Sequence, residues 1–596
     1  MASQHLSWSR PPPDLNELIP KDLPSGKEII REGVEIAATV EIGKSAFLTQ
    51  EGVQSELEYK LRLKKEGRVS THAHFGLNTV QATVEGLRFL YDQSMKRGIR
   101  IDRFGLSMNP VMGLPSDMRG KVPRGTGPVL WKEEDWIALA NAAPIQPHFG
   151  DFVIGSPASV ANTMMALKVG GTTIGNLAQY FTFEYAEWDD LKSRTIETVK
   201  ALGMMAALKK NGALVHSYID DGYGGIFSDY GDVAGWAMLE RYIVERLAGG
   251  RLAHCFGGLT SNPVTRLAWQ TALDRIHAKE TVGSMFYGNT IDLGEDLERN
   301  TAISSACSLV DIIGQLRNPT AHAIMPVPKT EPIRIPSPEE VLEAQVNARQ
   351  MEKEAERVLP MISFIASDLL AEKIVAEGKR FFESTLKGLK EMGVDVDDPL
   401  ELLLVLKRLG ANKVERFFGS GQRDELYPCG RRPVLETDMI KRTINLASHL
   451  TLDTKQTANL QGLKVLIAST DVHEYSLLAI ARLLAGRGAQ VTNLGPNVES
   501  PRWLVKAMIE SRPAIVVLTT HNGKALQYAT QLVDEMRQSR ITSVIVMGGV
   551  LNQSVGAEMP IDVTADLNRL GIVTSTNLAA LPSLIRTTLT GLAKSE

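Results

Sequence analysis

The chain has 596 residues, of which 43% are hydrophobic and 22% charged, and a formal net charge of −4 at pH 7. This is an ordinary globular balance, and the weak acidity gives no electrostatic reason to expect nucleic acid or an anionic membrane as a partner. The three cysteines, Cys255, Cys307 and Cys429, form no CxxC pair, which predicts a reducing compartment and no structural zinc.

The N-terminal segment MASQHLSWSRPPPDLNE is polar and rich in proline, so it lacks the apolar stretch of a signal peptide. The chain also lacks a run of about 18 consecutive apolar residues, the length that spans a bilayer. We therefore expect a cytoplasmic protein without a membrane anchor. Residues 1–60 predict an N-terminal arm with one or two helices.

Residues 61–328 alternate short β-rich runs with longer helical patterns. The predicted strands lie at 68–75, 103–110, 144–154, 171–181, 213–220, 251–258, 281–289 and 320–327. Helical stretches such as SVANTMMALKVG and DVAGWAMLERYIVERLAGG lie between them. Eight strand–helix alternations predict a (β/α)8 TIM barrel that serves as the substrate domain.

Polar residues gather where the predicted strands end, which in such a barrel is the rim that carries catalytic groups. They are His72, His74, Asn109, His148, Asn176, Tyr180, His216, Asp220, Asp221, Tyr223, Asn262, Tyr287, Asn289 and His322. The candidate catalytic residues among them are His72, His148, His216, Asn176, Tyr180, Asp220 and Tyr223. Each one has an alternative interpretation as an ordinary polar loop residue, so the set is more informative than any member.

Residues 329–460 predict a helical linker segment that begins in the proline-rich stretch KTEPIRIPSPEEV. From 461 to 596 the alternation returns, with buried strand patterns in LKVLIAST, GAQVTNLG, AIVVLTT, SVIVMGG and GIVTST. These predict a flavodoxin-like domain, a doubly wound, five-stranded parallel sheet. Such sheets bind ligands at the carboxyl ends of their strands.

The distinctive residues of this last domain all lie at those strand ends. Asp471 and His473 follow the first strand in the stretch STDVHEYS, Thr519 and Thr520 end the third, and Gly548 and Gly549 end the fourth. Between Ser476 and Thr519 there are 42 residues, and between His521 and Gly548 there are 26. One Asp-x-His turn is weak evidence, but three parts in register favour a single binding site.

These motifs resemble the fingerprint of the cobalamin-binding domain found in adenosylcobalamin-dependent mutases and corrinoid methyl-transfer proteins. The resemblance implies that His473 is the metal ligand, binding cobalt, with Asp471 as the carboxylate that orients it. It also implies that small or hydroxyl-bearing residues make room for the nucleotide tail of the cofactor. The implied cofactor-binding set is Thr470, Asp471, His473, Thr519, Thr520, Gly548 and Gly549. Ser476 and His521 depart from the family's glycine and leucine.

The barrel region resembles glutamate mutase and 2-methyleneglutarate mutase, through the stretches HFGDFVIGSPASVANTMMALKVGGTTIGN and HSYIDDGYGGIFSD. The resemblance implies an isomerase that uses adenosylcobalamin for a radical 1,2-rearrangement of a small carboxylic acid or related substrate. The barrel would exclude water from the radicals. A homodimer is a possible assembly. Two alternatives stay open: a corrinoid-dependent methyltransferase, and a cobalamin sensor or carrier without catalytic activity.

Glutamate itself is not the expected substrate, because the strand ends are rich in His, Asn and Tyr and poor in Arg. Bidentate arginines are the usual clamp for carboxylates. The arginines that could serve are Arg68, Arg103, Arg119 and Arg124.

Overall fold

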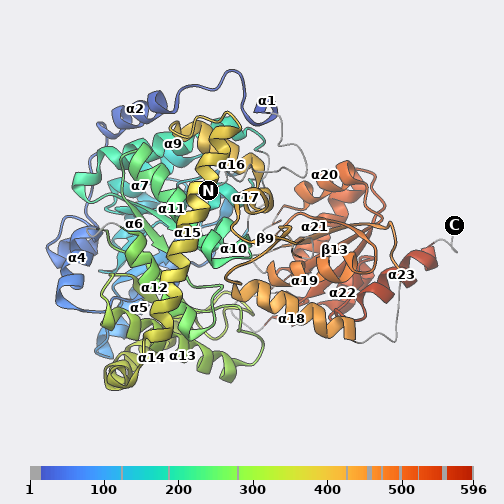
Figure 1. The fold of residues 1–596 in the computed structure, drawn as a ribbon. Coiled ribbons are helices and arrows are strands. Elements are labelled where there is room, and N and C mark those ends of the chain that lie inside the picture. Colours follow the sequence, from blue (N-terminus) through green and yellow to red (C-terminus); the bar gives the residue numbers. More distant parts are fainter. Residues whose placement is uncertain are drawn as a thin grey trace. The chain divides into compact units, whose positions relative to one another are not determined.

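The computed structural model describes residues 15–122, 125–185, 188–277, 281–424, 427, 429–452, 459–470, 474–495, 498, 500–520, 523–553 and 560–592. It divides into two compact units (Figure 1). The first unit contains Met1–Asn289, Ala302–Val327 and Val341–Thr437, and the second contains Thr290–Thr301, Pro328–Glu340 and Asp438–Glu596. The segment 329–460, predicted as a linker, is thus divided between both units.

The first unit is built on short parallel strands at the predicted places. They are β1 (His72–Phe75), β2 (Arg103–Leu106), β3 (Gln146–His148), β4 (Thr173–Ile174), β5 (Leu214–Tyr218), β6 (Leu252–Cys255), β7 (Met285–Tyr287) and β8 (Ala323–Met325). They pair in chain order as β1–β2–β3, β4–β5–β6 and β7–β8. The parallel bridges Phe149↔Ile174, Phe256↔Phe286 and Thr71↔Ile324 connect these three groups, the last one joining β8 to β1. These are the neighbours that the predicted barrel requires.

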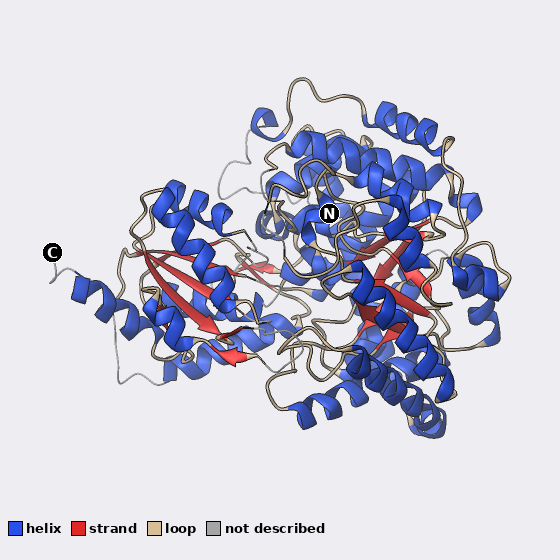
Figure 2. Cartoon of the chain, turned by 180° about the vertical axis from the view of Figure 1, so that it is seen from behind, coloured by secondary structure: helices blue, strands red, loops and turns tan. Residues whose placement is uncertain are grey.

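Helices lie outside these strands (Figure 2). The helices before and between the strands are α1 (Leu15–Leu18), α2 (Gly26–Ala37), α3 (Ala46–Glu51), α4 (Glu56–Glu66), α5 (Val80–Lys96), α6 (Glu133–Ala140), α7 (Ser159–Lys168), α8 (Gln179–Thr182), α9 (Leu191–Ala207), α10 (Tyr223–Ile226), α11 (Tyr230–Arg241), α12 (Pro263–Ile276) and α13 (Leu297–Arg317). Local signals start several of them. The Asn262 side chain, for example, accepts from the backbone N–H groups of Val264 and Thr265, and Pro263 occupies the first turn of α12.

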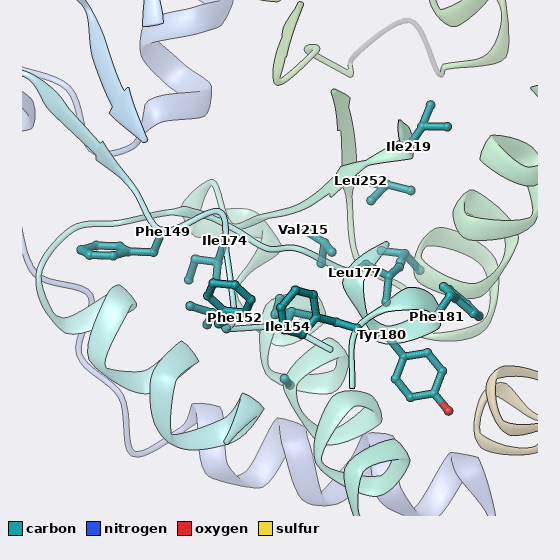
Figure 3. Packing of buried hydrophobic residues seen from close by; sticks show 14 of the residues in the cluster. Phe149, Phe152, Ile154, Ile174, Leu177, Tyr180, Phe181, Val215, Ile219 and Leu252 are labelled. Atoms are coloured by element: carbon teal, nitrogen blue, oxygen red, sulfur yellow. The ribbon is translucent and has the colours of Figure 1, made fainter. Parts of the chain in front are cut away.

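The helices that follow β8 pack on the first unit instead of standing apart as a linker. They are α14 (Pro338–Val358), α15 (Ile365–Glu391), α16 (Pro399–Leu409) and α17 (Ala411–Phe418). Figure 1 shows α15 running beside α11 and α12, and the three are in contact. Apolar residues of α15 and α16, such as Ile374, Phe381 and Leu403, therefore belong to the same core as the helices that lie between the strands. Part of this core is drawn in Figure 3.

The second unit is the five-stranded parallel sheet that the sequence predicts. Its strands are β11 (Lys464–Ser469), β12 (Gln490–Asn493), β13 (Ile515–Thr520), β14 (Val544–Gly549) and β17 (Val573–Thr574), and their order is β12–β11–β13–β14–β17. This is the flavodoxin-like order. Its helices are α18 (Asp438–Leu452), α19 (Glu474–Ala485), α20 (Pro501–Ser511), α21 (Ala525–Gln538), α22 (Thr564–Arg569) and α23 (Leu581–Leu592).

Alternation along the buried strands gives this sheet two apolar faces. Leu466, Val516 and Met547 point to one face and pack with residues of α20, α21 and α22. Val465, Ile467 and Val517 point to the other face and pack with residues of α19 and α23. Burying both faces leaves the strand ends as the place where polar groups meet.

Short two-stranded pairs complete the described strands. They are β9 (Gln422–Arg423) with β10 (Arg431–Arg432), and β15 (Asn552–Gln553) with β16 (Ile561–Asp562). Among the helices that the structure describes, none is long and apolar enough to cross a bilayer.

Candidate functional site

Three of the predicted catalytic residues, His72, His148 and His216, come together inside the first unit. They lie on β1, at the end of β3 and on β5. Their ring centroids are 5.8 Å apart for His72 and His148 and 4.4 Å apart for His148 and His216. All three are at most 1% exposed. Parallel strands with alternate residues facing inward place these imidazoles in one group, which we call the histidine cluster.

The histidine cluster is electrically neutral. Burial, aided by the positive charge of Arg103, holds the pKa of each imidazole well below its ordinary value. His148 Nδ1 lies 3.0 Å from the Thr173 carbonyl oxygen, so Nδ1 carries the proton and Nε2 is left as an acceptor. Among the described residues, neither His148 Nε2 nor either ring nitrogen of His72 has a hydrogen-bond partner. Unsatisfied buried nitrogens of this kind are rare unless water or a ligand completes them.

A set of paired charges lies beneath the histidine cluster, at the amino ends of the strands. Glu56 and Lys60 of α4 reach in beside Arg103, whose Nε lies 3.1 Å from a Glu56 carboxylate oxygen. Lys60 donates to the carbonyl oxygens of Gly283 and Ser284 at 2.6 Å each. Arg103 donates to the Ser284 carbonyl and hydroxyl oxygens at 3.0 Å, and that hydroxyl lies 2.8 Å from His216 Nδ1. Lys60 and Arg103 thus both have protein partners. We call these residues, with Glu56 and Ser284, the floor of the histidine cluster, because their contacts fix its lower side.

The opposite, carboxyl ends of the strands carry an acidic group. The Asn176 amide donates to an Asp221 carboxylate oxygen at 2.8 Å and, through its own oxygen, accepts from the Tyr218 N–H at 2.8 Å. The Gln179 amide donates to Asp151 at 3.1 Å and to Asp221 at 3.4 Å. Burial raises the pKa of Asp151 to about 6, and burial together with the charge of Asp151 raises the pKa of Asp221 well above its ordinary value. Groups that change protonation near neutral pH are suited to proton transfer.

Asp220 faces a different set of partners. One of its carboxylate oxygens accepts from the backbone N–H groups of Gly257 at 2.8 Å and Leu259 at 3.4 Å. Burial raises the pKa of Asp220 to about 6. Its observed contacts therefore tie η3 (Ile219–Asp221) to the loop that follows β6.

Tyr180 and Tyr223 do not join the histidine cluster. The Tyr180 hydroxyl lies 2.7 Å from Thr195 Oγ1 on α9, and Figure 3 shows it pointing away from the labelled aliphatic side chains. The Tyr223 hydroxyl donates to the Leu406 carbonyl of α16 at 3.1 Å. Each tyrosine hydroxyl therefore links the short helix that carries it to an outer helix, α9 for Tyr180 and α16 for Tyr223.

The arginines considered as carboxylate clamps are engaged elsewhere or lie outside the described part. Arg103 belongs to the floor, and exposed Arg68 pairs with Glu66 at 3.1 Å. Arg119 donates to the carbonyls of Leu114, Leu130 and Met112 and to the Asn162 side chain. Arg124 is outside the described residues.

Sequence reasoning missed Asp151, Gln179, Glu56 and Lys60. Asp151, Gln179 and Asp221 lie after β3, at the start of α8 and at the end of η3, so only the folded chain brings these three residues together. Glu56 and Lys60 sit in a highly charged helix, ELEYKLRLKKE, that a sequence pattern assigns to solvent. Asp151 lay inside the predicted strand at 144–154, whereas the observed strand β3 ends at His148 and leaves Asp151 in the segment that follows. No group of three or more His, Cys, Asp or Glu side chains in the described part is arranged to hold a metal ion.

In the second unit, the predicted cofactor residues meet at the carboxyl edge of the sheet. The register pairs Ser469 with Thr519, Thr519 with Gly548, and Thr520 with Gly549. Thr470 Oγ1 donates to Thr520 Oγ1 at 2.9 Å, and the Thr470 N–H donates to the Thr519 carbonyl at 2.9 Å. The Thr519 hydroxyl is buried and has no partner among the described residues.

Gly549 fits this edge only as glycine. Its φ of 98° lies in the region that L side chains rarely adopt, and a Cβ there would lie 2.2 Å from the Thr520 carbonyl oxygen. Asp471 and His473, and the departure His521, lie outside the described residues. The described part of the site fits a cobalamin nucleotide tail, because it offers a buried hydroxyl in need of a partner beside backbone free of bulky side chains.

Residues 464–563 match the family model of the B12 binding domain. The second unit therefore contains a B12-binding domain, which supports cobalamin as a cofactor of this chain. A search of the curated proteins finds no match for this chain.

Two solved structures show weak overall similarity. One is a novel cobalamin-binding protein from Desulfitobacterium hafniense, 13% identical, covering 49% of this chain and 98% of that chain with a TM-score of 0.18. The other is the methanol:cobalamin methyltransferase complex from Methanosarcina barkeri, 12% identical, covering 50% of this chain and 82% of that chain with a TM-score of 0.18. At such identities and TM-scores, neither likeness indicates what this chain does.

Proposed function

We propose that the chain is an adenosylcobalamin-dependent mutase that rearranges a small carboxylic acid or a related polar substrate, and that its ring of eight parallel strands is the predicted (β/α)8 barrel. The observation that carries the proposal is the histidine cluster: neutral, buried, and incompletely hydrogen-bonded, in a chain that also has a B12-binding domain. Radical chemistry requires an enclosed site with fixed polar groups that do not themselves need water.

Within this proposal each part of the chain has one task. Adenosylcobalamin, when bound, supplies the radical chemistry. Thr470, Thr519, Thr520, Gly548 and Gly549, with Asp471 and His473, would hold the cofactor. The imidazoles would orient the substrate through neutral hydrogen bonds. Asp151 and Asp221 would hold protons at the carboxyl end of the strands.

The test is an anaerobic titration of the full chain with adenosylcobalamin, followed by electron paramagnetic resonance spectra on addition of candidate acids and acyl thioesters. A cobalt(II)–radical signal that depends on one substrate supports the mutase. Binding of methylcobalamin with methyl transfer, and no such signal with any substrate, would replace it with the methyltransferase. Failure to bind either cobalamin would contradict both enzymes.

A further inference from the structure

Two carboxyl groups at the ends of different strands share one neutral donor. Asp151 follows β3 and Asp221 follows β5, and the Gln179 amide nitrogen lies 3.1 Å from the first and 3.4 Å from the second. Both aspartates are only partly buried, unlike the histidine cluster beneath them. The side-chain donors that the structure gives them are amides, Gln179 for both and Asn176 for Asp221. Two nearby carboxylates held by neutral groups repel each other, and a cation between them would relieve that repulsion.

The buried arginines at this end of the strands are directed elsewhere. Arg194 donates to the carbonyls of Gly155, Phe183, Gln179 and Tyr180. Arg266 forms a bidentate pair with Asp311 and donates to the carbonyls of Gly257, Thr260 and Tyr287. Their guanidinium groups are used to fix loops, as is that of Arg119. Among the described residues, no arginine at this end is therefore directed at the two carboxyl groups, and a bound cation would stabilise their ionised forms.

A second observation points to a ligand at the same place. His148 is 1% exposed, and its Nε2 has no partner in the described part of the chain. A Cβ placed on Gly150 would lie 2.5 Å from this nitrogen, so Nε2 faces the backbone one residue before Asp151. Glycine at 150 keeps that approach open. The bare acceptor nitrogen of His148 and one carboxyl group of the pair, that of Asp151, thus lie on the same short segment, 148–151.

We infer that Asp151 and Asp221 bind the ammonium group of an amino-bearing substrate, while His148 Nε2 accepts a hydrogen bond from a donor of the same molecule. This assignment rests on the proposed function, since it names the substrate class of that site. It favours a substrate with one amino group and a neutral polar group over a dicarboxylate.

The assignment predicts a proton linkage. Within the part of the chain that the structure describes, the titratable groups facing the pair are Asp220, Tyr185, Tyr218 and Cys255, and none of these is a cation. Without ligand, burial raises the pKa of Asp151 to about 6, and burial with the charge of Asp151 raises the pKa of Asp221 well above its ordinary value. An ammonium group stabilises both carboxylates, so binding releases a proton from the pair and affinity rises as the pH goes from 6 to 8.

The experiment measures binding of four five-carbon probes that differ only in charge: 1,5-diaminopentane, 5-aminopentanoate, 1,5-pentanediol and glutarate. Isothermal titration calorimetry of the cobalamin-loaded full chain, in two buffers of different ionisation enthalpy, gives affinity and released protons together. We expect the two amines to bind at least tenfold more tightly than glutarate, with proton release. Glutarate binding more tightly than both amines would overturn the inference.

Isosteric variants locate the effect. Asp151→Asn and Asp221→Asn should each weaken amine binding about tenfold and reduce proton release, with glutarate unaffected. Asp117→Asn, an exposed surface acid, is the control for general charge. Amine binding that survives both site variants would refute the assignment. Cobalamin affinity, measured separately by absorbance, tests the proposed function: its loss with amine binding intact would contradict the mutase and leave the cation site standing.

Discussion

The hydroxyl of Thr470 donates to the hydroxyl of Thr520 at 2.9 Å, across the neighbouring strands β11 and β13, while the Thr519 hydroxyl beside them is buried without a partner among the described residues. Threonine residues next to each other in sequence are thus in opposite states. One is satisfied by the protein and the other is available to a ligand.

Replacing Thr519 should separate binding from folding. Thr519→Val removes a hydroxyl that the described protein does not use, so the stability of the cobalamin-free chain should stay equal or rise by up to about 1 kcal/mol. Cobalamin affinity should fall about tenfold, as for one lost hydrogen bond. Absorbance titration and calorimetry measure the two quantities. The control, Thr520→Val, removes the acceptor of the Thr470 hydroxyl and should instead lower stability by about 1–2 kcal/mol. Unchanged affinity in Thr519→Val would contradict a role for this hydroxyl.

Gly549→Ala tests the close approach at the sheet edge. The variant must hold an L residue at a φ of 98° and bring Cβ to within 2.2 Å of the Thr520 carbonyl oxygen. The strain of holding an L residue at this φ alone costs about 1–3 kcal/mol. Gly571 is a matched control in the same unit, because its φ is 85° but a Cβ there meets nothing within 4 Å.

We therefore expect calorimetry to show a clearly larger loss of stability for Gly549→Ala than for Gly571→Ala. Only the first variant should also lose cobalamin binding. Equal losses in the two variants would mean that the contact with Thr520 does not matter.

His473→Ala tests the predicted cobalt ligand. With wild-type protein in which histidine carries ¹⁵N, the electron paramagnetic resonance spectrum of bound cob(II)alamin should show the splitting of a ¹⁵N ligand in place of ¹⁴N. The variant should lose this signature, and the free energy of unfolding of both proteins, measured alongside, shows whether the fold survives. Ser476→Gly, which restores the glycine of the family, should retain it. A spectrum insensitive to the isotope would rule out histidine ligation.

The sequence predicted the strands of both units because each combines a short apolar run with a polar residue where it ends. The doubly wound, five-stranded parallel sheet followed from the alternation of strands and helices. The buried charged residues beneath the histidine cluster were harder to predict from the sequence. Glu56 and Lys60 lie in a helix whose charges look solvated, and only their contacts with Arg103 and with residues 283 and 284, more than 200 positions away in the case of Lys60, explain their burial.

Side-chain direction was the other limit on prediction. Tyr180 and Tyr223 stand among strand-end residues in the sequence, yet their hydroxyls bond to outer helices. A position near a strand end does not reveal which way a side chain on a following helical turn will point. Asp151 and Asp221 likewise become recognisable as a pair only through Gln179, the first residue of α8, whose amide donates to both carboxyl groups.

The last prediction concerns buried acids where α11 meets α17. Asp229, Asp232 and Glu415 are each 2% exposed. The Glu415 carboxylate accepts from the Ser228 N–H at 2.7 Å, and Cys429, Arg431 and Glu377 are the other titratable groups that face this cluster. Burial raises the pKa of Glu415 from 4.5 to about 7. Burial and the charge of Glu415 raise the pKa of Asp232 well above its ordinary value.

These shifts fix the sign of the pH dependence. In the folded chain Glu415 keeps its proton up to about pH 7, whereas in the unfolded chain it loses it near 4.5, so between these values the unfolded state binds fewer protons. The free energy of unfolding therefore falls as pH rises through this window, by up to about 3 kcal/mol from Glu415. Glu415→Gln, which cannot ionise, should flatten this decline and be more stable than wild type at pH 8. Glu354→Gln, in an exposed ion pair, should follow the wild-type curve. Denaturant unfolding from pH 4.5 to 8 measures all three, and a Glu415→Gln curve parallel to wild type would show that this carboxyl is already ionised in the folded protein.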